Sequence, residues 1–243
     1  MTTTAIPLAL AQEPPLEIPP PPASHPFRAR QVWRLLTSLR ADPEQTELAL
    51  QVFEAVGGDG GESTFQRFAR TDEGQRLLAS RPRIADHLAD HEALAALPDG
   101  SFGRAYLDFA TENGFDADGL AQINRDVERE THDELDPYRQ WFWDRYSTCH
   151  DLWHVLTGCS TVPDDEAMLL AFSQAQTPQR GYRALLAMIV AQANVDVRFQ
   201  LALVRAWRAG KRAAPLVAVH WEEQLARPID ELRRELRVET IAW

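Results

Sequence analysis

Apolar side chains recur along most of the chain at intervals of three and four residues, which is the spacing of one face of an α-helix. The first two runs consist of Val32, Leu35, Leu36 and Leu39, and of Leu48, Val52, Phe53 and Val56. Gly57 and Gly58 end the second predicted helix, because glycine readily adopts the left-handed conformation found at helix C-termini.

Turn residues divide the following segment into short predicted helices near 62–69, 72–80 and 83–97. Ser101 is a predicted N-cap for a helix that ends near Asn113. Pro137 suits the first turn of a long helix that runs from Tyr138 to about Leu156.

The longest periodic apolar stretch extends from about Gln179 to Ala209. A final amphipathic helix opens at Pro228, and its apolar positions are Leu225, Ile229, Leu232 and Leu236. The pattern contains no convincing pair of strands and no internal repeat. The sequence therefore predicts an all-α fold.

The N-terminus differs from the rest of the chain because it is rich in proline, with Glu13-Pro14-Pro15 followed by Pro19 to Pro22. Proline cannot continue a helix and favours extended, solvated backbone. We therefore predict a disordered tail over residues 1–26 and one all-helical domain over residues 27–243. The 243 residues are 44% hydrophobic, which is enough for one sizeable core.

The formal net charge of −11 argues against general nucleic-acid binding, which depends on clustered Lys and Arg. Cys149 and Cys159 read as parts of one helix, where ten residues separate them by about 15 Å. A disulfide cannot span that distance, so a reducing, cytoplasmic compartment is expected. No run approaches the roughly 20 apolar residues of a membrane span, and no signal peptide is indicated, so the chain should be soluble or peripheral.

The candidate chemistry concentrates in the segment Cys149-His150-Asp151-Leu152-Trp153-His154. His150 and His154 stand at positions i and i+4, so both imidazoles project from one helix face about one turn apart. Asp151 can reach the same centre, and Glu166 follows after a turn at Gly158 and Pro163. Two imidazoles with one or two carboxylates suit Zn²⁺, although Fe²⁺ and Mn²⁺ use similar ligands.

A helix-surface histidine pair beside a solvated acidic turn is the simpler alternative. A dense group of aromatic residues flanks the histidines and indicates that this helix is buried. Buried histidines need hydrogen-bond or metal partners, which argues against the surface alternative. The flank consists of Trp141, Phe142, Trp143, Tyr146 and Trp153. The metalloprotease signature is absent, since it places Glu after the first histidine. His25, His87, His91, His132 and His220 are interpreted as surface or ordinary hydrogen-bonding residues.

The spacing from His150-Asp151 through His154 to Glu166 resembles the metal motif of the ubiquinone (coenzyme Q) biosynthesis protein Coq-four family. Segments 70–78, 97–106 and 221–236 resemble that family in the same order, over about residues 30–239. The segment 171–177 departs from the family pattern and keeps only its Gln-Thr pair. This departure bears on the identity of the substrate and the partners more than on the metal site.

The resemblance implies an all-helical, zinc-binding, peripheral membrane protein that works with other ubiquinone-biosynthesis enzymes. It also implies a zinc-dependent lyase, in which His150, Asp151, His154 and Glu166 serve the decarboxylation at carbon 1 of a polyprenyl-hydroxybenzoate, with or without hydroxylation there. An apolar tunnel for the prenyl tail is expected, and a homo-oligomer is left open. The candidate tunnel residues are Leu185, Leu186, Met188, Ile189, Val195, Phe199 and Leu203.

Two other functions compete with this one. The chain could be a non-catalytic scaffold that binds prenyl lipids and organises the biosynthetic complex. It could also be a metal-dependent phosphohydrolase of the HD type, which would need His87 or His91 together with Asp196 near the His150-Asp151 pair.

Overall fold

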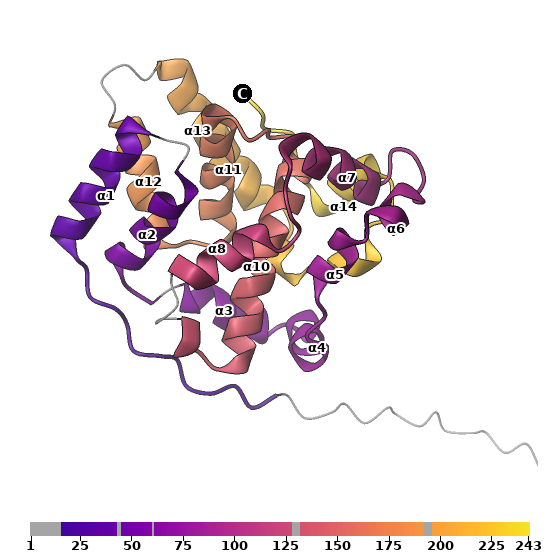
Figure 1. Ribbon diagram of the computed structural model, residues 1–243, viewed down its shortest axis with the longest axis horizontal. Coiled ribbons are helices and arrows are strands. Elements are labelled where there is room, and N and C mark those ends of the chain that lie inside the picture. Colours follow the sequence, from indigo (N-terminus) through magenta and orange to yellow (C-terminus); the bar gives the residue numbers. More distant parts are fainter. Residues whose placement is uncertain (1–15, 43–44, 60, 128–131, 192–195) are drawn as a thin grey trace, which may run out of the picture.

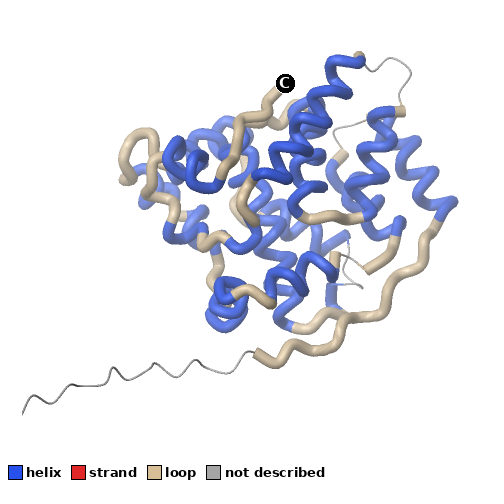
Figure 2. The backbone as a smooth tube through the Cα atoms, turned by 180° about the vertical axis from the view of Figure 1, so that it is seen from behind, coloured by secondary structure: helices blue, strands red, loops and turns tan. Residues whose placement is uncertain are grey.

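The computed structural model describes residues 16–42, 45–59, 61–127, 132–191 and 196–243. Within these ranges the protein is helical and contains no strand (Figures 1 and 2). Two isolated β-bridges join His25 to Gly58 and Ser101 to Pro228. The predicted all-α fold class is confirmed.

The first helices along the chain are α1 (Ala29–Ala41), α2 (Thr46–Val56), α3 (Glu62–Ala69), α4 (Asp72–Ser80), α5 (Ile84–Ala89), α6 (His91–Ala95), α7 (Phe102–Asn113) and α8 (Gly119–Val127). They are followed by α10 (Pro137–Thr157), α11 (Pro163–Gln176), α12 (Arg180–Val190), α13 (Val197–Arg212) and α14 (Ile229–Leu236). Two short 3-10 helices, η1 (Leu216–Ala218) and η2 (Trp221–Glu223), precede α14. Most of the predicted boundaries agree with these.

The long helix α10 lies in the middle of the molecule, and the other helices surround it (Figure 1). Local sequence explains where it begins and ends. Asp136 caps its N-terminus by accepting hydrogen bonds from the backbone N–H groups of Tyr138 and Arg139. Gly158 ends it in the left-handed conformation, with φ of 76°. The capping at both ends sets the position of the histidine pair near the C-terminal end of the helix.

Three features differ from the predictions, namely the helix over 83–97, the place of Cys159 and helix α8. The helix expected over 83–97 divides into α5 and α6, because the Asp90 side chain accepts a hydrogen bond from Ala93 N–H and starts a new helix. The long periodic stretch that begins near Gln179 contains α12 and α13. Cys159 lies just beyond the end of α10, and both cysteines are free and buried. Helix α8 was not predicted.

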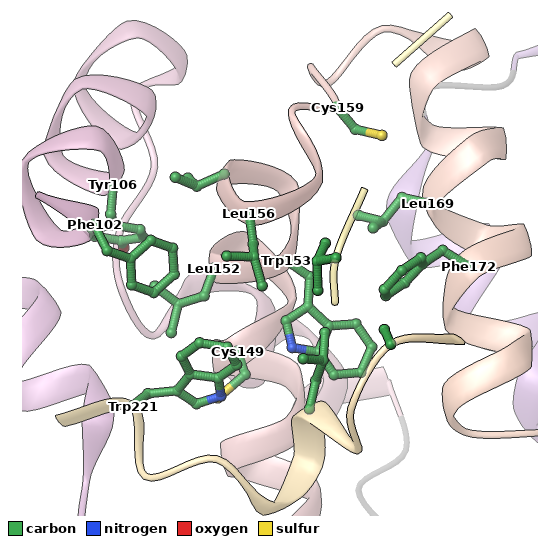
Figure 3. Packing of buried hydrophobic residues seen from close by; sticks show 14 of the residues in the cluster. Phe102, Tyr106, Cys149, Leu152, Trp153, Leu156, Cys159, Leu169, Phe172 and Trp221 are labelled. Atoms are coloured by element: carbon green, nitrogen blue, oxygen red, sulfur yellow. The ribbon is translucent and has the colours of Figure 1, made fainter. Parts of the chain in front are cut away.

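The main core forms where one side of α10 meets α7, α11 and η2 (Figure 3). Trp153 and Leu152 of α10 pack there against Phe172 of α11 and Trp221 of η2. A second apolar cluster joins α1, α2 and α12 on the other side of the molecule. The two clusters leave a space between them, which contains the site described below.

The predicted N-terminal tail is extended over residues 16–26 and follows the edge of the helical body (Figure 2). Leu16 N–H donates a hydrogen bond to Gln75 Oε1 at 2.7 Å. The guanidinium of Arg139, which is completely buried, donates to the carbonyl oxygen of Pro19 at 3.2 Å and also to Glu62 and Asp136. These contacts attach the segment to α4 and α10. Residues 1–15 lie outside the described residues.

Candidate metal centre

Three predicted metal ligands come together where α10 faces the first turn of α11. His150 and His154 project from one face of α10, and their ring centroids are 4.7 Å apart. Glu166 approaches them from α11. One ligand atom from each of these three residues lies within 4.8 Å of the other two. The i, i+4 spacing and the turn at Gly158 thus bring together three of the four residues that the sequence predicted as ligands.

Contacts on both sides of the ring hold His154 in one orientation. Its Nδ1 lies 3.2 Å from the carbonyl oxygen of Cys159. A carbonyl can only accept, so Nδ1 carries a proton, and in the neutral imidazole the lone pair then lies on Nε2. That Nε2 lies 3.3 Å from Glu166 Oε1, and Phe109 stacks on the ring with centroids 5.4 Å apart. This is the arrangement of a histidine prepared to bind a cation through Nε2.

Asp151 occupies a different position from the other three. Its Oδ1 is 3.6 Å from His150 Nδ1, beyond hydrogen-bond distance, and its carboxylate is not part of the three-residue cluster. The Nδ1 atom of His150 is buried and has no hydrogen-bond partner. The Asp151 carboxylate lies beside His150. A direct role of Asp151 as a metal ligand stays a prediction.

The charges around the cluster favour a cation. Burial lowers the pKa of His150, but the neighbouring Asp151 and the charge of Glu166 raise this pKa by more. Burial raises the pKa of Glu166, but its contact with His154 and the charges of both histidines lower this pKa by more. Positive charge is therefore stabilised between α10 and α11.

The residues fit a divalent metal ion. A buried imidazole nitrogen without a partner, a second imidazole with its Nε2 lone pair free and a facing carboxylate supply three ligands and leave coordination positions open. Catalytic zinc and non-haem Fe²⁺ both use two histidines and one carboxylate. The geometry supports a metal site without deciding between these ions.

A cavity of about 1350 Å³ has the cluster in its wall. Its volume exceeds the range of roughly 300–1,000 Å³ that is usual for small-ligand pockets. Four of the predicted tunnel residues line it, namely Leu185, Met188, Ile189 and Phe199. Leu186 and Leu203 instead pack in the main core, and Val195 lies outside the described residues. The cavity therefore offers a large, mainly apolar space beside the polar cluster.

The arrangement needed for an HD-type phosphohydrolase does not form. His87 and His91 lie on α5 and α6, and neither lines the cavity, although Asp196 does. Among the described residues, the one group of three or more potential metal ligands is His150, His154 and Glu166. His132 also lines the cavity but pairs with Asp144 at 3.1 Å.

Two tyrosines on the cavity wall were not recognised in the sequence. The hydroxyl groups of Tyr146 and Tyr182 are hydrogen-bonded to each other, and that of Tyr146 also lies 2.9 Å from Thr177 Oγ1. Tyr146 was interpreted only as part of the aromatic flank. The available signal was its position one helical turn before His150, on the same face of α10.

The family model described as Coenzyme Q (ubiquinone) biosynthesis protein Coq4 matches residues 32–242. The chain belongs to the Coq4 family. A Talaromyces stipitatus protein named ubiquinone biosynthesis protein coq4, mitochondrial, is 35% identical over 168 residues, which are 68% of this chain and 56% of that protein. Its Sclerotinia sclerotiorum counterpart is 34% identical and is covered over 57% of its length.

A solved structure has the same fold. A crystal structure from Nostoc punctiforme, described as a ubiquinone biosynthesis protein, matches 87% of this chain and 98% of its own, with a TM-score of 0.57 and 21% identity. The chain spans little more than half the length of the curated Coq4 relatives that it matches. The fold and the family are therefore shared, over the part of those relatives that aligns.

The predicted cytoplasmic compartment is contradicted, because the matching Coq4 relatives are named as mitochondrial proteins. Two cysteines that cannot pair exclude a disulfide scaffold, but they do not distinguish one compartment from another. No helix in the described ranges has the length and hydropathy of a membrane span.

Proposed function

We propose that this Coq4-family chain acts in ubiquinone biosynthesis by removing the carboxylate at ring carbon 1 of a polyprenyl-hydroxybenzoate. One observation carries the proposal. The His150–His154–Glu166 cluster lies in the wall of a large cavity whose remaining walls are mainly apolar. Such a cavity suits a molecule with one polar ring and a long hydrocarbon tail.

The apolar lining would hold the tail. Leu185, Met188 and Ile189 of α12 face the cavity together with Phe53 of α2 and Phe199 of α13. An isoprenoid chain offers only apolar surface, and its burial contributes about 25 cal/mol per Å². A bound tail would displace water from the cavity beside the polar end of the site, which would strengthen electrostatic interactions there.

The polar end would carry the chemistry. His150, His154 and Glu166 would hold the metal, proposed to be Zn²⁺, which when bound supplies a Lewis acid toward a substrate oxygen. When the bond between carbon 1 and the carboxylate breaks, carbon dioxide leaves and the electron pair on carbon 1 takes up a proton. The Cys159 carbonyl, which lies at hydrogen-bond distance from His154 Nδ1, keeps the His154 ring oriented during this step. Asp151, whose carboxylate lies beside His150, would deliver the proton in this step.

Helix α13 supports the proposed peripheral contact with a membrane. It contains no acidic residue, and its cationic residues are Arg198, Arg205, Arg208, Lys211 and Arg212. Its exposed apolar residues are Val197, Leu201, Val204 and Trp207. A basic helix with an apolar outer face is suited to an anionic lipid surface, and it stands out in a chain of net charge −11.

We expect the protein to float with vesicles of phosphatidylcholine and phosphatidylserine in a density gradient. The double substitution Arg205→Glu and Arg208→Glu should abolish flotation, because each basic residue near an anionic surface contributes about 1 kcal/mol. The charge-matched control is Arg76→Glu with Arg83→Glu, both exposed and far from α13 in sequence. Equal flotation of the two double variants would refute the role of α13.

The proposed reaction is tested with a prenylated 4-hydroxybenzoate that carries labelled carbon in its carboxylate. Metal-loaded protein is expected to release labelled carbon dioxide, and His150→Ala is expected to lower the rate by at least about 100-fold, because the metal is lost. Circular dichroism checks that the variant is folded. Bound ligand without release by the wild type would instead favour the scaffold function, in which the chain presents the prenyl lipid to other ubiquinone-biosynthesis enzymes.

A further inference from the structure

The hydroxyl groups of Tyr146, Tyr182 and Thr177 form a continuous hydrogen-bonded chain. Both tyrosine side chains line the cavity, whereas Thr177 is completely buried behind them. Tyr146 belongs to α10, Tyr182 to α12, and Thr177 is the C-cap of α11. Three helices thus contribute to one polar feature in a largely apolar wall.

The direction of the hydrogen bonds in this chain follows from the number of protons. Thr177 Oγ1 donates its only proton to the carbonyl oxygen of Ser173 at 3.1 Å. It must therefore accept from Tyr146, whose proton is then used as well. Tyr146 in turn accepts from Tyr182. Every proton is committed inside the protein, and the lone pairs that remain on the two tyrosine oxygens can only accept.

Packing holds both rings in place. The Tyr182 ring meets Phe53 edge-on, with centroids 4.8 Å apart. Tyr146 lies between Trp143 and Trp153, with centroid distances of 5.5 and 5.4 Å. Burial raises the pKa of Tyr146 to about 12, so the phenol stays neutral near pH 7. The tyrosine pair is thus a rigid, neutral hydrogen-bond acceptor.

Its position relative to the metal cluster is set by α10. Tyr146, His150 and His154 follow one another at intervals of four residues, so they form a stripe along one helix face. Four residues correspond to about 6 Å along the axis. That length is comparable to a benzene ring with substituents at opposite ends. A ring lying along the stripe can therefore reach the cluster with one substituent and the tyrosines with the other.

We propose that Tyr146 and Tyr182 accept a hydrogen bond from the phenolic hydroxyl of the ligand, while its carboxylate faces His150, His154 and Glu166. This inference rests on the proposed function and adds to it the groups that recognise the hydroxyl. A ligand whose hydroxyl is methylated cannot donate and leaves both acceptors unpaired. Discrimination of this kind arises because a buried polar group without a partner is costly.

The experiment uses metal-loaded protein and two probes, 3-farnesyl-4-hydroxybenzoate and 3-farnesyl-4-methoxybenzoate, with binding measured by isothermal titration calorimetry. The wild type is expected to bind the hydroxyl probe about tenfold more tightly. Tyr146→Phe and Tyr182→Phe should bind the two probes with nearly equal affinity. Tyr138→Phe is the matched control, because Tyr138 lies on α10 outside the cavity, and it should keep the preference.

Two results would overturn the inference. If the wild type binds both probes equally and still releases carbon dioxide from the hydroxyl probe, recognition by the tyrosines is refuted and the proposed function stands. If the Phe variants keep the full preference, the hydroxyl is recognised elsewhere. A wild type that binds neither probe would refute the inference and the proposed function together.

Discussion

The substitution His150→Ala is expected to reduce the metal content of the purified protein from about one ion per chain to a small fraction, because one of three protein ligands is lost. Losing even an outer partner of a metal ligand costs about 10–100-fold in affinity, so losing a direct ligand should cost more. His150 is a better choice than His154, because its side chain is 22% exposed and that of His154 only 1%. Elemental mass spectrometry gives the stoichiometry and also distinguishes Zn²⁺ from Fe²⁺ and Mn²⁺.

His132→Ala is the matched control for this measurement. His132 also lines the cavity and faces an acidic residue, but it lies outside the cluster. We expect it to retain the wild-type metal content. A folded His150→Ala protein that still carries one ion per chain, or a carefully prepared wild type that carries none, would contradict the assignment of the site.

Arg145→Met is expected to lower the free energy of unfolding by about 3–5 kcal/mol, because it leaves the Glu222 carboxylate buried without its partner. The guanidinium donates to both carboxylate oxygens of Glu222, at 2.6 and 2.9 Å, and to the carbonyl oxygen of Val219 at 3.2 Å. The two side chains are only 5% and 7% exposed. Urea denaturation followed by circular dichroism measures the loss.

The Arg145–Glu222 pair should also make the free energy of unfolding fall as the pH is lowered. Burial raises the pKa of Glu222, but its hydrogen bond to Arg145 and the charge of Arg145 lower this pKa by more. A carboxylate with a lowered pKa in the folded state stabilises the protein above its unfolded pKa of about 4.3, and this contribution disappears as the pH falls through the lowered value. Arg145→Met with Glu222→Gln should remove that dependence and recover part of the lost stability. An Arg145→Met protein as stable as the wild type would contradict the expected loss in the free energy of unfolding.

The sequence was sufficient to predict α10 and its histidine pair because the information is local. Pro137 and Gly158 mark the two ends of the helix, and the spacing of His150 and His154 places both on one face. Glu166 follows soon after the turn, so its approach was also predictable. Asp151 was predicted to reach the same centre, but adjacent residues on a helix point in directions about 100° apart, and its carboxylate lies beside His150 outside the cluster.

The tyrosine pair could not be predicted in the same way. Tyr146 and Tyr182 are 36 residues apart in the sequence, and they meet only because α12 packs beside α11 and α2. No local pattern encodes that packing. The division of segment 83–97 was missed for a different reason, since the cap formed by Asp90 competes with a helical pattern that continues through it.

Gln176 and Thr177, the pair for which segment 171–177 was predicted to keep the family pattern, both have structural roles. Gln176 donates through its side-chain amide to the Gly210 carbonyl oxygen at 2.6 Å and accepts from Leu216 N–H at 3.0 Å. It therefore connects the end of α11 to α13 and η1. Thr177 ends the hydroxyl chain that begins at Tyr182. The two residues join the helices around the cavity, whereas their neighbours 171–175 are mostly buried packing residues.

The buried guanidinium of Arg139 constrains the order in which parts of the chain fold together. Its three acceptors come from distant parts of the chain: Glu62 in α3, Asp136 before α10 and the carbonyl of Pro19. The free-energy cost of removing this cation from water is offset only when both carboxylates are already in place. Segment 16–26 should therefore dock after α3 and α10 have met, as a late step of folding, and its release would still leave the buried cation paired with two acids.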